Sequence, residues 1–320
     1  WKNLYYEYVA CEYEEAWESN PVGFLVSGGF AAHFFDTVSP TFMMELVEGR
    51  HEFIEQPLKQ ELANKWNAGC AAGILNAPDP SFNPLIDRDI NFQYGPENHV
   101  EGKQNNKLFI QQALGLIQDD SAPLFFWPSR LDMIQKGCQL LAEILYKVVS
   151  RYWDQNLEIV FVANGEFKRH FEDIVKYHNL YNRVAICDFD ERLSRLAYGA
   201  SDFLLMPSLF EPCGLPQMIG PIYGTLPVAR DTGGIHDTIV HMDVDNNSGN
   251  GFLFNIFDSR GLFWAIEQAM HFYKLPREIK ELQIERIMNQ SLASFNHAVT
   301  ASRYIELYEK MLRRPLISED

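Results

Sequence analysis

From about residue 121 onward, short apolar runs alternate with longer segments in which apolar residues recur every three or four positions. The short runs have the length of buried parallel strands, and the longer segments have the spacing of amphipathic helices. Strands are expected in "APLFFWPS", "LEIVFVANG", "RVAICDF", "DFLLMPS", "TLPVARD" and "GFLFN", with helices between them and at the end of the chain. This alternation predicts an α/β fold with a doubly wound parallel sheet, which binds ligands beyond the carboxyl ends of its strands.

The chain before about residue 115 has a different pattern. A helix is expected in "YYEYVACEYEEAWE", strands are expected in "FFDTVS" and around "AAGIL", and a second helix is expected to begin near Ser39 and Pro40. The stretch "YGPENHVEGKQNNK" is typical of a surface linker or of the start of a helix. Because so few strands are expected here, we interpret this part as the end of a further, incomplete domain.

The composition narrows the classes of function. The 320 residues carry a net charge of −16 and are 47% hydrophobic, so the chain can form a large core but lacks the basic face of a general nucleic-acid binder. No apolar run reaches the length of a membrane span and no signal peptide is visible, so no membrane partner is expected. The five cysteines are scattered without metal-binding spacing; we therefore expect inert thiols, Cys213 included, and neither a metal nor a cofactor.

Polar motifs stand directly after two of the expected strands. Glu211 and Gly214 follow "DFLLMPS" in the segment "SLFEPCGLPQ". Thr232, Gly233 and Gly234 follow the next expected strand, "TLPVARD". A carboxylate and glycines at the carboxyl ends of strands do not improve packing, whereas they suit a site where backbone approaches a ligand closely.

Four segments together resemble the glycogen and starch synthase family: "PSLFEPCGLPQ", "VARDTGGIHDTI", "SRLDMIQKG" and "TVSPTF…GILNAPD". Members of this family are retaining glucosyltransferases of the GT-B type, which has two Rossmann-like domains. The resemblance implies an incomplete N-terminal, acceptor-side domain and linker in residues 1–115, and a complete C-terminal Rossmann-like domain in residues 116–295 that binds the nucleotide sugar. It also implies a helix in residues 296–320 that crosses back to the first domain. The family's Lys-x-Gly-Gly loop is missing, so the chain is expected to be a piece of a longer protein and to be inactive alone.

The resemblance implies a role for each side chain of the site. Arg130 and Lys136 would neutralise the donor diphosphate, the alternative being two solvated surface cations. Glu211 would grip the donor glucose, the alternative being a cap for a helix that begins near Gly214. The ring of Phe189 would stack on the base, the alternative being a core phenylalanine.

Further contacts with the nucleotide sugar are expected from backbone amides and from one residue that matches a cleft-facing position of the family. They involve Gly214, Leu215, Thr232, Gly233, Gly234 and Asn76. Two features depart from the family pattern. Leu209 stands where an arginine is usual, and the interval between Arg130 and Lys136 is longer than in the commonest members.

The activity implied by the resemblance is transfer of glucose from ADP-glucose to the non-reducing end of an α-1,4-glucan, glycogen or starch, with retention of configuration. UDP-glucose is the alternative donor. Two other functions stay open: a different GT-B glycosyltransferase, for example one like sucrose synthase, and an inactive module that binds a sugar nucleotide or a glucan. The expected location is the cytoplasm, or the plastid if the source is a plant or an alga.

Overall fold

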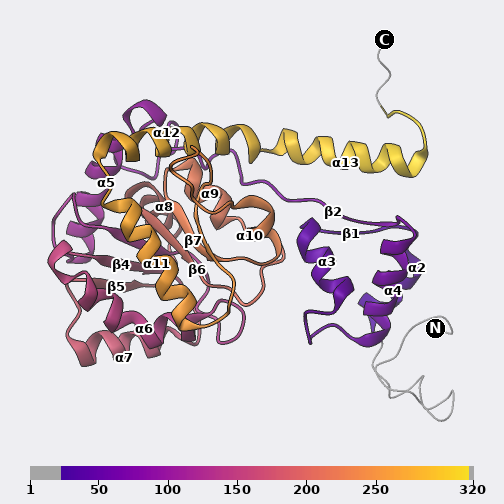
Figure 1. Ribbon diagram of the computed structural model, residues 1–320, viewed down its shortest axis with the longest axis horizontal. Helices are drawn as coiled ribbons and strands as arrows, with labels where there is room; N and C mark the ends of the chain where they lie inside the picture. Colours follow the sequence, from indigo (N-terminus) through magenta and orange to yellow (C-terminus); the bar gives the residue numbers. More distant parts are fainter. Residues whose placement is uncertain (1–22, 317–320) are drawn as a thin grey trace. The chain divides into compact units, whose positions relative to one another are not determined.

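The computed structural model describes residues 23–316, so the helix expected in "YYEYVACEYEEAWE" lies outside the described part. The chain forms two compact units, which divide between Leu75 and Asn76 (Figure 1). Within the described residues, no helix is both long enough and apolar enough to cross a membrane.

The smaller unit pairs two short parallel strands and packs helices around a small apolar core. Its elements are α2 (Phe24–Ala31), β1 (Phe35–Thr37), α3 (Pro40–Glu48), α4 (Gln56–Asn67) and β2 (Ala71–Gly73). The predicted start of α3 is confirmed, because the hydroxyl of Ser39 accepts a hydrogen bond from the N–H of Phe42 at 2.9 Å. A Cβ atom at Gly73 would lie 2.2 Å from the backbone of Ser39. Glycine therefore lets β2 pass directly beside the start of α3.

The larger unit contains a six-stranded sheet in which every neighbouring pair is parallel, in the order β5-β4-β3-β6-β7-β8. The strands are β3 (Leu124–Trp127), β4 (Glu158–Val162), β5 (Val184–Cys187), β6 (Phe203–Met206), β7 (Leu226–Arg230) and β8 (Phe252–Phe254). Each lies in one of the six apolar runs, so the predicted doubly wound parallel sheet is confirmed.

Helices cover both faces of this sheet (Figure 1). One face packs against α6 (Cys138–Arg151), α7 (Lys168–His178) and α11 (Ser259–Tyr273). The other face packs against α5 (His99–Leu114), α8 (Glu191–Ala200), α9 (Pro216–Ile222), α10 (Gly233–Thr238) and α12 (Arg277–Ser294). The short helices η1 (Pro96–Asn98) and η2 (Trp153–Gln155) and the last helix, α13 (His297–Leu312), complete the larger unit. Side chains alternate between the two faces, so the central strands β3, β4 and β6 are buried on both sides, whereas the edge strand β5 is partly exposed.

The segment before β3 belongs to the larger unit, although we expected a domain boundary near residue 115. Tyr94 donates its hydroxyl to the carbonyl oxygens of Gly199 at 3.1 Å and Tyr223 at 2.8 Å. Of the two alternatives for "YGPENHVEGKQNNK", the start of a helix is confirmed, because α5 begins at His99. The surface linker is wrong, because one polar face of α5 is buried against the sheet domain. The buried polar residues are His99, Lys103, Asn106, Lys107 and Gln111.

Candidate functional site

The candidate site lies where the order of the strands reverses. β3 and β6 are neighbours in the sheet, but the chain leaves β3 toward β4 on one side and leaves β6 toward β7 on the other. The loops after two such strands separate, and the crevice between them is the usual ligand site of an open α/β sheet. Arg130 and Lys136 lie in the loop after β3, and Glu211 lies in the loop after β6.

An ion pair joins these two loops. The ammonium nitrogen of Lys136 lies 2.6 Å from Oε2 of Glu211, and the hydroxyl of Ser208 donates to the same oxygen at 3.0 Å. The side chains of Lys136 and Glu211 are only 12% and 7% exposed. Lys136 is therefore not a solvated surface cation. The cap alternative for Glu211 is also wrong, because α9 begins at Pro216 and the carboxylate is held by Lys136 and Ser208 instead.

Arg130 supplies a second positive charge at the same edge. Its side chain is exposed and makes no hydrogen bond or ion pair with the rest of the described chain. The loop that carries it ends at Gly137, which caps α6 in the left-handed conformation with φ of 69°. A Cβ atom at Gly137 would lie 2.0 Å from the carbonyl oxygen of Pro207, so only glycine allows this loop to pack on the loop after β6.

The two glycine-containing motifs are in direct contact. The N–H of Gly234 donates to the carbonyl oxygen of Glu211 at 2.9 Å. A Cβ atom at Gly233 would lie 2.1 Å from that oxygen, and one at Gly234 would lie 2.0 Å from the carbonyl oxygen of Cys213. Thr232 is the buried N-cap residue of α10. The structure thus brings the turn after β7 against the backbone of Glu211 and Cys213.

Two residues that we did not single out brace the same loop. The guanidinium of Arg230, at the end of β7, donates to the carbonyl oxygens of Ser208 and Leu209. The carbonyl oxygen of Gln135 accepts the N–H of Leu209 at 2.7 Å. Arg230 could have been found from the sequence, because a charged residue at the end of a buried strand is rare without a partner.

Phe189 lies in the loop after β5, the edge strand that is separated from β3 by β4. Its ring is 57% exposed, so the core alternative is wrong. The backbone N–H of Phe189 donates to Oδ1 of Asn164 at 3.0 Å, and the carbonyl oxygen of Asn164 accepts the N–H of Leu131 at 2.9 Å. The loops after β3, β4 and β5 are therefore linked to one another.

Cys213, Asn76 and Leu215 lie around the Glu211 loop. Burial raises the pKa of the Cys213 thiol to about 11, so the thiol is protonated at neutral pH and packs as a small apolar group. A hydrogen bond joins Cys213 to the backbone of Asn76, whose side chain is exposed. Gly214, with φ of 73°, and the exposed Leu215 precede α9. Among the described residues, no group of three or more His, Cys, Asp or Glu side chains is placed to hold a metal ion.

The chain is similar to glycosyl transferases in each comparison with known proteins. Residues 122–271 match the family described as "Glycosyl transferases group 1". The glycogen synthase of Bacillus subtilis is 33% identical over 297 residues, which are 91% of this chain and 58% of that protein. The glycogen synthase of Thermosipho melanesiensis is 33% identical over 298 residues, 92% of this chain and 58% of that protein.

The solved structures agree. The catalytic domain of starch synthase IV from Arabidopsis thaliana, bound to ADP and acarbose, superposes with a TM-score of 0.79 at 30% identity. That match covers 92% of this chain and 58% of the other. Sucrose-phosphate synthase from Thermosynechococcus elongatus shares the fold, with a TM-score of 0.57 at 16% identity over 90% of this chain and 72% of the other.

The fold and the matched segment therefore place the chain in the class of group 1 glycosyl transferases with the GT-B type of α/β fold. More narrowly, the chain belongs to the glycogen and starch synthase family. It spans a little over half the length, 58%, of the curated relatives it matches.

Proposed function

We propose that the larger unit binds the donor of a retaining glucosyltransferase, which moves glucose from ADP-glucose to the non-reducing end of an α-1,4-glucan. The observation that carries this proposal is the contact between Lys136 and Glu211 at the point where the strand order reverses. This contact sets an ammonium group, which suits a phosphate, beside a carboxylate, which suits sugar hydroxyls. The exposed Arg130 adds a second cation at the same edge.

In the proposed reaction, the leaving diphosphate is held by Arg130 and Lys136. The guanidinium offers a planar pair of donors and the ammonium offers a compact charge. Glu211 accepts hydrogen bonds from the glucose and stabilises the positive charge that develops at the anomeric carbon. The leaving phosphate takes the proton of the acceptor hydroxyl on the same face of the sugar, which retains the configuration. Because Lys136 contacts Glu211, it shares its charge between the carboxylate and the arriving phosphate.

The nucleotide is proposed to lie along the loops after β5, β6 and β7. The exposed ring of Phe189 suits stacking on a base, which needs only an accessible aromatic face. The backbone at Gly214, Leu215 and the turn of residues 232–234 is proposed to face phosphate or sugar oxygens. ADP is the favoured nucleotide because the starch synthase IV structure, at 30% identity, contains ADP. The same structure contains acarbose, which supports a glucan as the acceptor.

The proposal is tested by comparing two substitutions at the carboxyl edge of the sheet, one at Arg130 and one at Glu211. Arg130→Ala removes a charge-assisted contact with the diphosphate and should weaken ADP binding about tenfold or more in calorimetric titrations. Glu211→Gln should leave ADP affinity within about threefold of the parent, because the carboxylate faces the sugar. It should lower glucose transfer from ADP-glucose to glycogen by about 100-fold or more in the protein as it occurs in its source.

Lys147→Ala, on the exposed surface of α6, is the control and should change neither property. Equal and large losses of ADP affinity in Arg130→Ala and Glu211→Gln would contradict the assignment of sugar to one residue and diphosphate to the other.

A further inference from the structure

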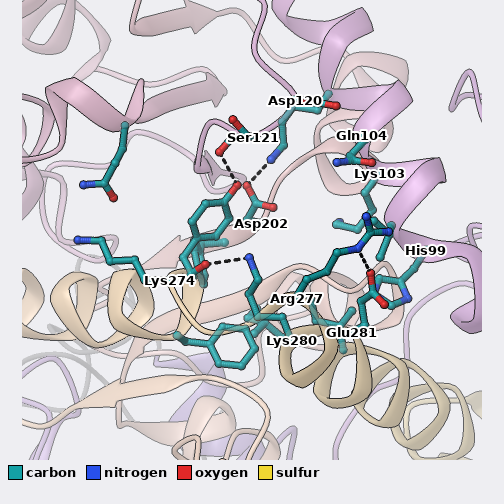
Figure 2. Close-up of a pocket in the computed structure, with 18 of the residues that line it drawn as sticks. His99, Lys103, Gln104, Asp120, Ser121, Asp202, Lys274, Arg277, Lys280 and Glu281 are labelled. Atoms are coloured by element: carbon teal, nitrogen blue, oxygen red, sulfur yellow. Dashed lines mark hydrogen bonds and ion pairs between the residues drawn. The ribbon is translucent and has the colours of Figure 1, made fainter.

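A separate pocket opens at the opposite edge of the same sheet, where the strands begin. It has a volume of about 580 Å³, within the usual range for small-molecule sites. Phe203 and Leu226, the first residues of β6 and β7, form part of its lining. The walls come from α5, from the loop before β3, from the end of α11 and from the start of α12 (Figure 2). The loops that carry Lys136 and Glu211 follow the carboxyl ends of strands, so the proposed donor site and this pocket lie at opposite edges of the sheet.

The cations of this pocket are not all neutralised by the chain. Lys107 forms an ion pair with Asp202 at 2.7 Å. Lys103, in contrast, is fully buried and donates to uncharged oxygens, the carbonyl of Tyr223 and the hydroxyl of Thr225, both at 2.9 Å. No carboxylate within the described chain forms an ion pair with Lys103. The lining also contains five carboxylates, so positive charge is available to a ligand only locally, where a cation has no ion pair. The carboxylates are those of Asp119, Asp120, Asp154, Asp202 and Glu281.

The start of α12 adds two further cations. Lys280 donates to the carbonyl oxygen of Tyr273 at 2.8 Å and has no ion pair with a described residue. Arg277 uses its Nε to contact Glu281, which leaves the terminal N–H groups of the guanidinium for another acceptor. Both side chains line the pocket, so an anion at this end would meet an ammonium and a guanidinium together.

The facing side of the pocket has the opposite character. In Figure 2, Asp120 and Ser121 lie across the pocket from Arg277 and Lys280. Both Asp120 and Ser121 are exposed, so their oxygens can accept hydrogen bonds from an occupant. Tyr273 links the two sides: its hydroxyl donates to the carbonyl oxygen of Ser121 at 2.9 Å, and the ammonium groups of Lys280 and Lys107 lie over its ring, 4.6 and 5.7 Å from the centroid.

We propose that this pocket is a second ligand site, which binds a phosphorylated sugar. The phosphate contacts Lys280 and Arg277, and the sugar hydroxyls donate to Asp120 and Ser121. An occupant with one anionic end and several hydroxyl groups satisfies both sides, whereas a simple anion satisfies only one. The site does not depend on the activity proposed for the donor edge.

The protonation of Lys103 provides an independent signature of occupancy. Burial, opposed by the charge of Asp202 and aided by that of Lys107, lowers the pKa of Lys103 to about 7. The neighbouring His99 also has its pKa lowered by burial. A bound phosphate would stabilise the charged form of Lys103, so binding above pH 7 takes up a proton. The affinity for the phosphorylated sugar should therefore fall as pH rises from 7.5 to 9, because Lys103 loses its proton. The phosphate group itself does not titrate in this range, since its second pKa is about 6.

The test uses the full chain carrying Arg130→Ala, which weakens the donor edge, and titrates it with glucose 1-phosphate by calorimetry. Binding should remain in this background and should weaken about tenfold or more when Lys280→Met is added. Arg277→Ala should have the same direction of effect. Lys147→Met, on the exposed surface of α6, is the matched control, and thermal melts check that each variant is folded.

Two results would overturn the site: no binding in the Arg130→Ala chain, or binding that Lys280→Met and Arg277→Ala both leave intact. Inorganic phosphate, glucose and AMP identify the ligand class. Each should bind about tenfold more weakly than glucose 1-phosphate; phosphate of equal affinity would overturn the role of the sugar, and tighter AMP would reassign the pocket to a nucleotide. None of these experiments measures glucose transfer, so a negative result for this pocket is distinguishable from a negative result for the proposed donor site.

Discussion

The two edges of the parallel sheet are built by different means. At the carboxyl edge, backbone packs on backbone, and Gly137, Gly233 and Gly234 each stand where a Cβ atom would meet a carbonyl oxygen. At the amino edge, long side chains of α5 reach across the domain, and Lys103 and Lys107 end among carbonyl, hydroxyl and carboxylate oxygens. The difference shows that steric fit fixes the carboxyl edge, whereas the balance of buried charge governs the amino edge.

The largest effect is expected from breaking the steric fit. Gly233→Ala places a Cβ atom 2.1 Å from the carbonyl oxygen of Glu211 and also strains a backbone with φ of 46°. We expect the free energy of unfolding to fall by about 2–5 kcal/mol, from overpacking and left-handed strain together. Urea denaturation measures this, and ADP binding should be lost with it.

Gly115→Ala is the matched control for that substitution. Gly115 has φ of 71° but has nothing within 4 Å of its Cβ position, so alanine there adds strain without a clash. The free energy of unfolding of Gly115→Ala should be lower than that of the parent by about 1–2 kcal/mol. Equal losses at Gly233 and Gly115 would show that backbone conformation, not steric fit, governs the carboxyl edge.

A dependence on pH is expected from the buried charge at the amino edge. Glu158 begins β4 and accepts a hydrogen bond from Gln111 at 2.8 Å, and burial raises its pKa to about 8. The folded state therefore holds a proton that the unfolded state loses above the ordinary glutamate pKa of 4.5. The free energy of unfolding should fall as pH rises from 5 to 8, by up to about 1.4 kcal/mol per pH unit.

Glu158→Gln tests the origin of that slope. The amide has the shape of the protonated carboxyl group, so the variant should resemble the parent at pH 5 and exceed it in stability at pH 8. Glu143→Gln, on the exposed surface of α6, should keep the parent slope. If the slope survives in Glu158→Gln, the buried carboxyl group is not its source. Urea denaturation at several pH values provides the measurement.

The smallest effect is expected at Phe189, whose exposed ring contributes little to the stability of the fold. Phe189→Ala should weaken ADP binding by about 1–3 kcal/mol, the usual contribution of a base stacked on an aromatic ring. Phe189→Tyr should leave the affinity nearly unchanged. Because the ring is exposed, the melting temperature should not change; a lower melting temperature with unaltered ADP affinity would assign the ring to packing instead.

The same contrast explains what could be predicted from the sequence. The strands of the sheet were predictable because each lies in a short apolar run, and the central strands β3, β4 and β6 are buried on both faces. The carboxyl edge was partly predictable because Glu211, Gly214 and the turn of residues 232–234 are compact motifs that follow predicted strands. The ion pair between Lys136 and Glu211 was not predictable, because it joins residues 75 positions apart whose loops meet only once the sheet is formed.

The amino edge was missed for a physical reason. The stretch that contains Lys103 and Lys107 is rich in polar residues, which pattern analysis assigns to the surface. In the structure, these side chains are buried because carbonyl, hydroxyl and carboxylate oxygens of distant elements satisfy them. The acceptors of Lys103 lie more than 90 positions away from it in the sequence, so no local sequence motif predicts these contacts.

The glycine-mediated contact between Glu211 and the turn after β7 has a consequence for the kinetics of donor binding. A loop that is already locked against its neighbour loses little conformational entropy when a nucleotide arrives. For the proposed donor, we expect association to be limited by diffusion and by the orientation of the ligand, so that affinity differences among nucleotides arise in their rates of dissociation.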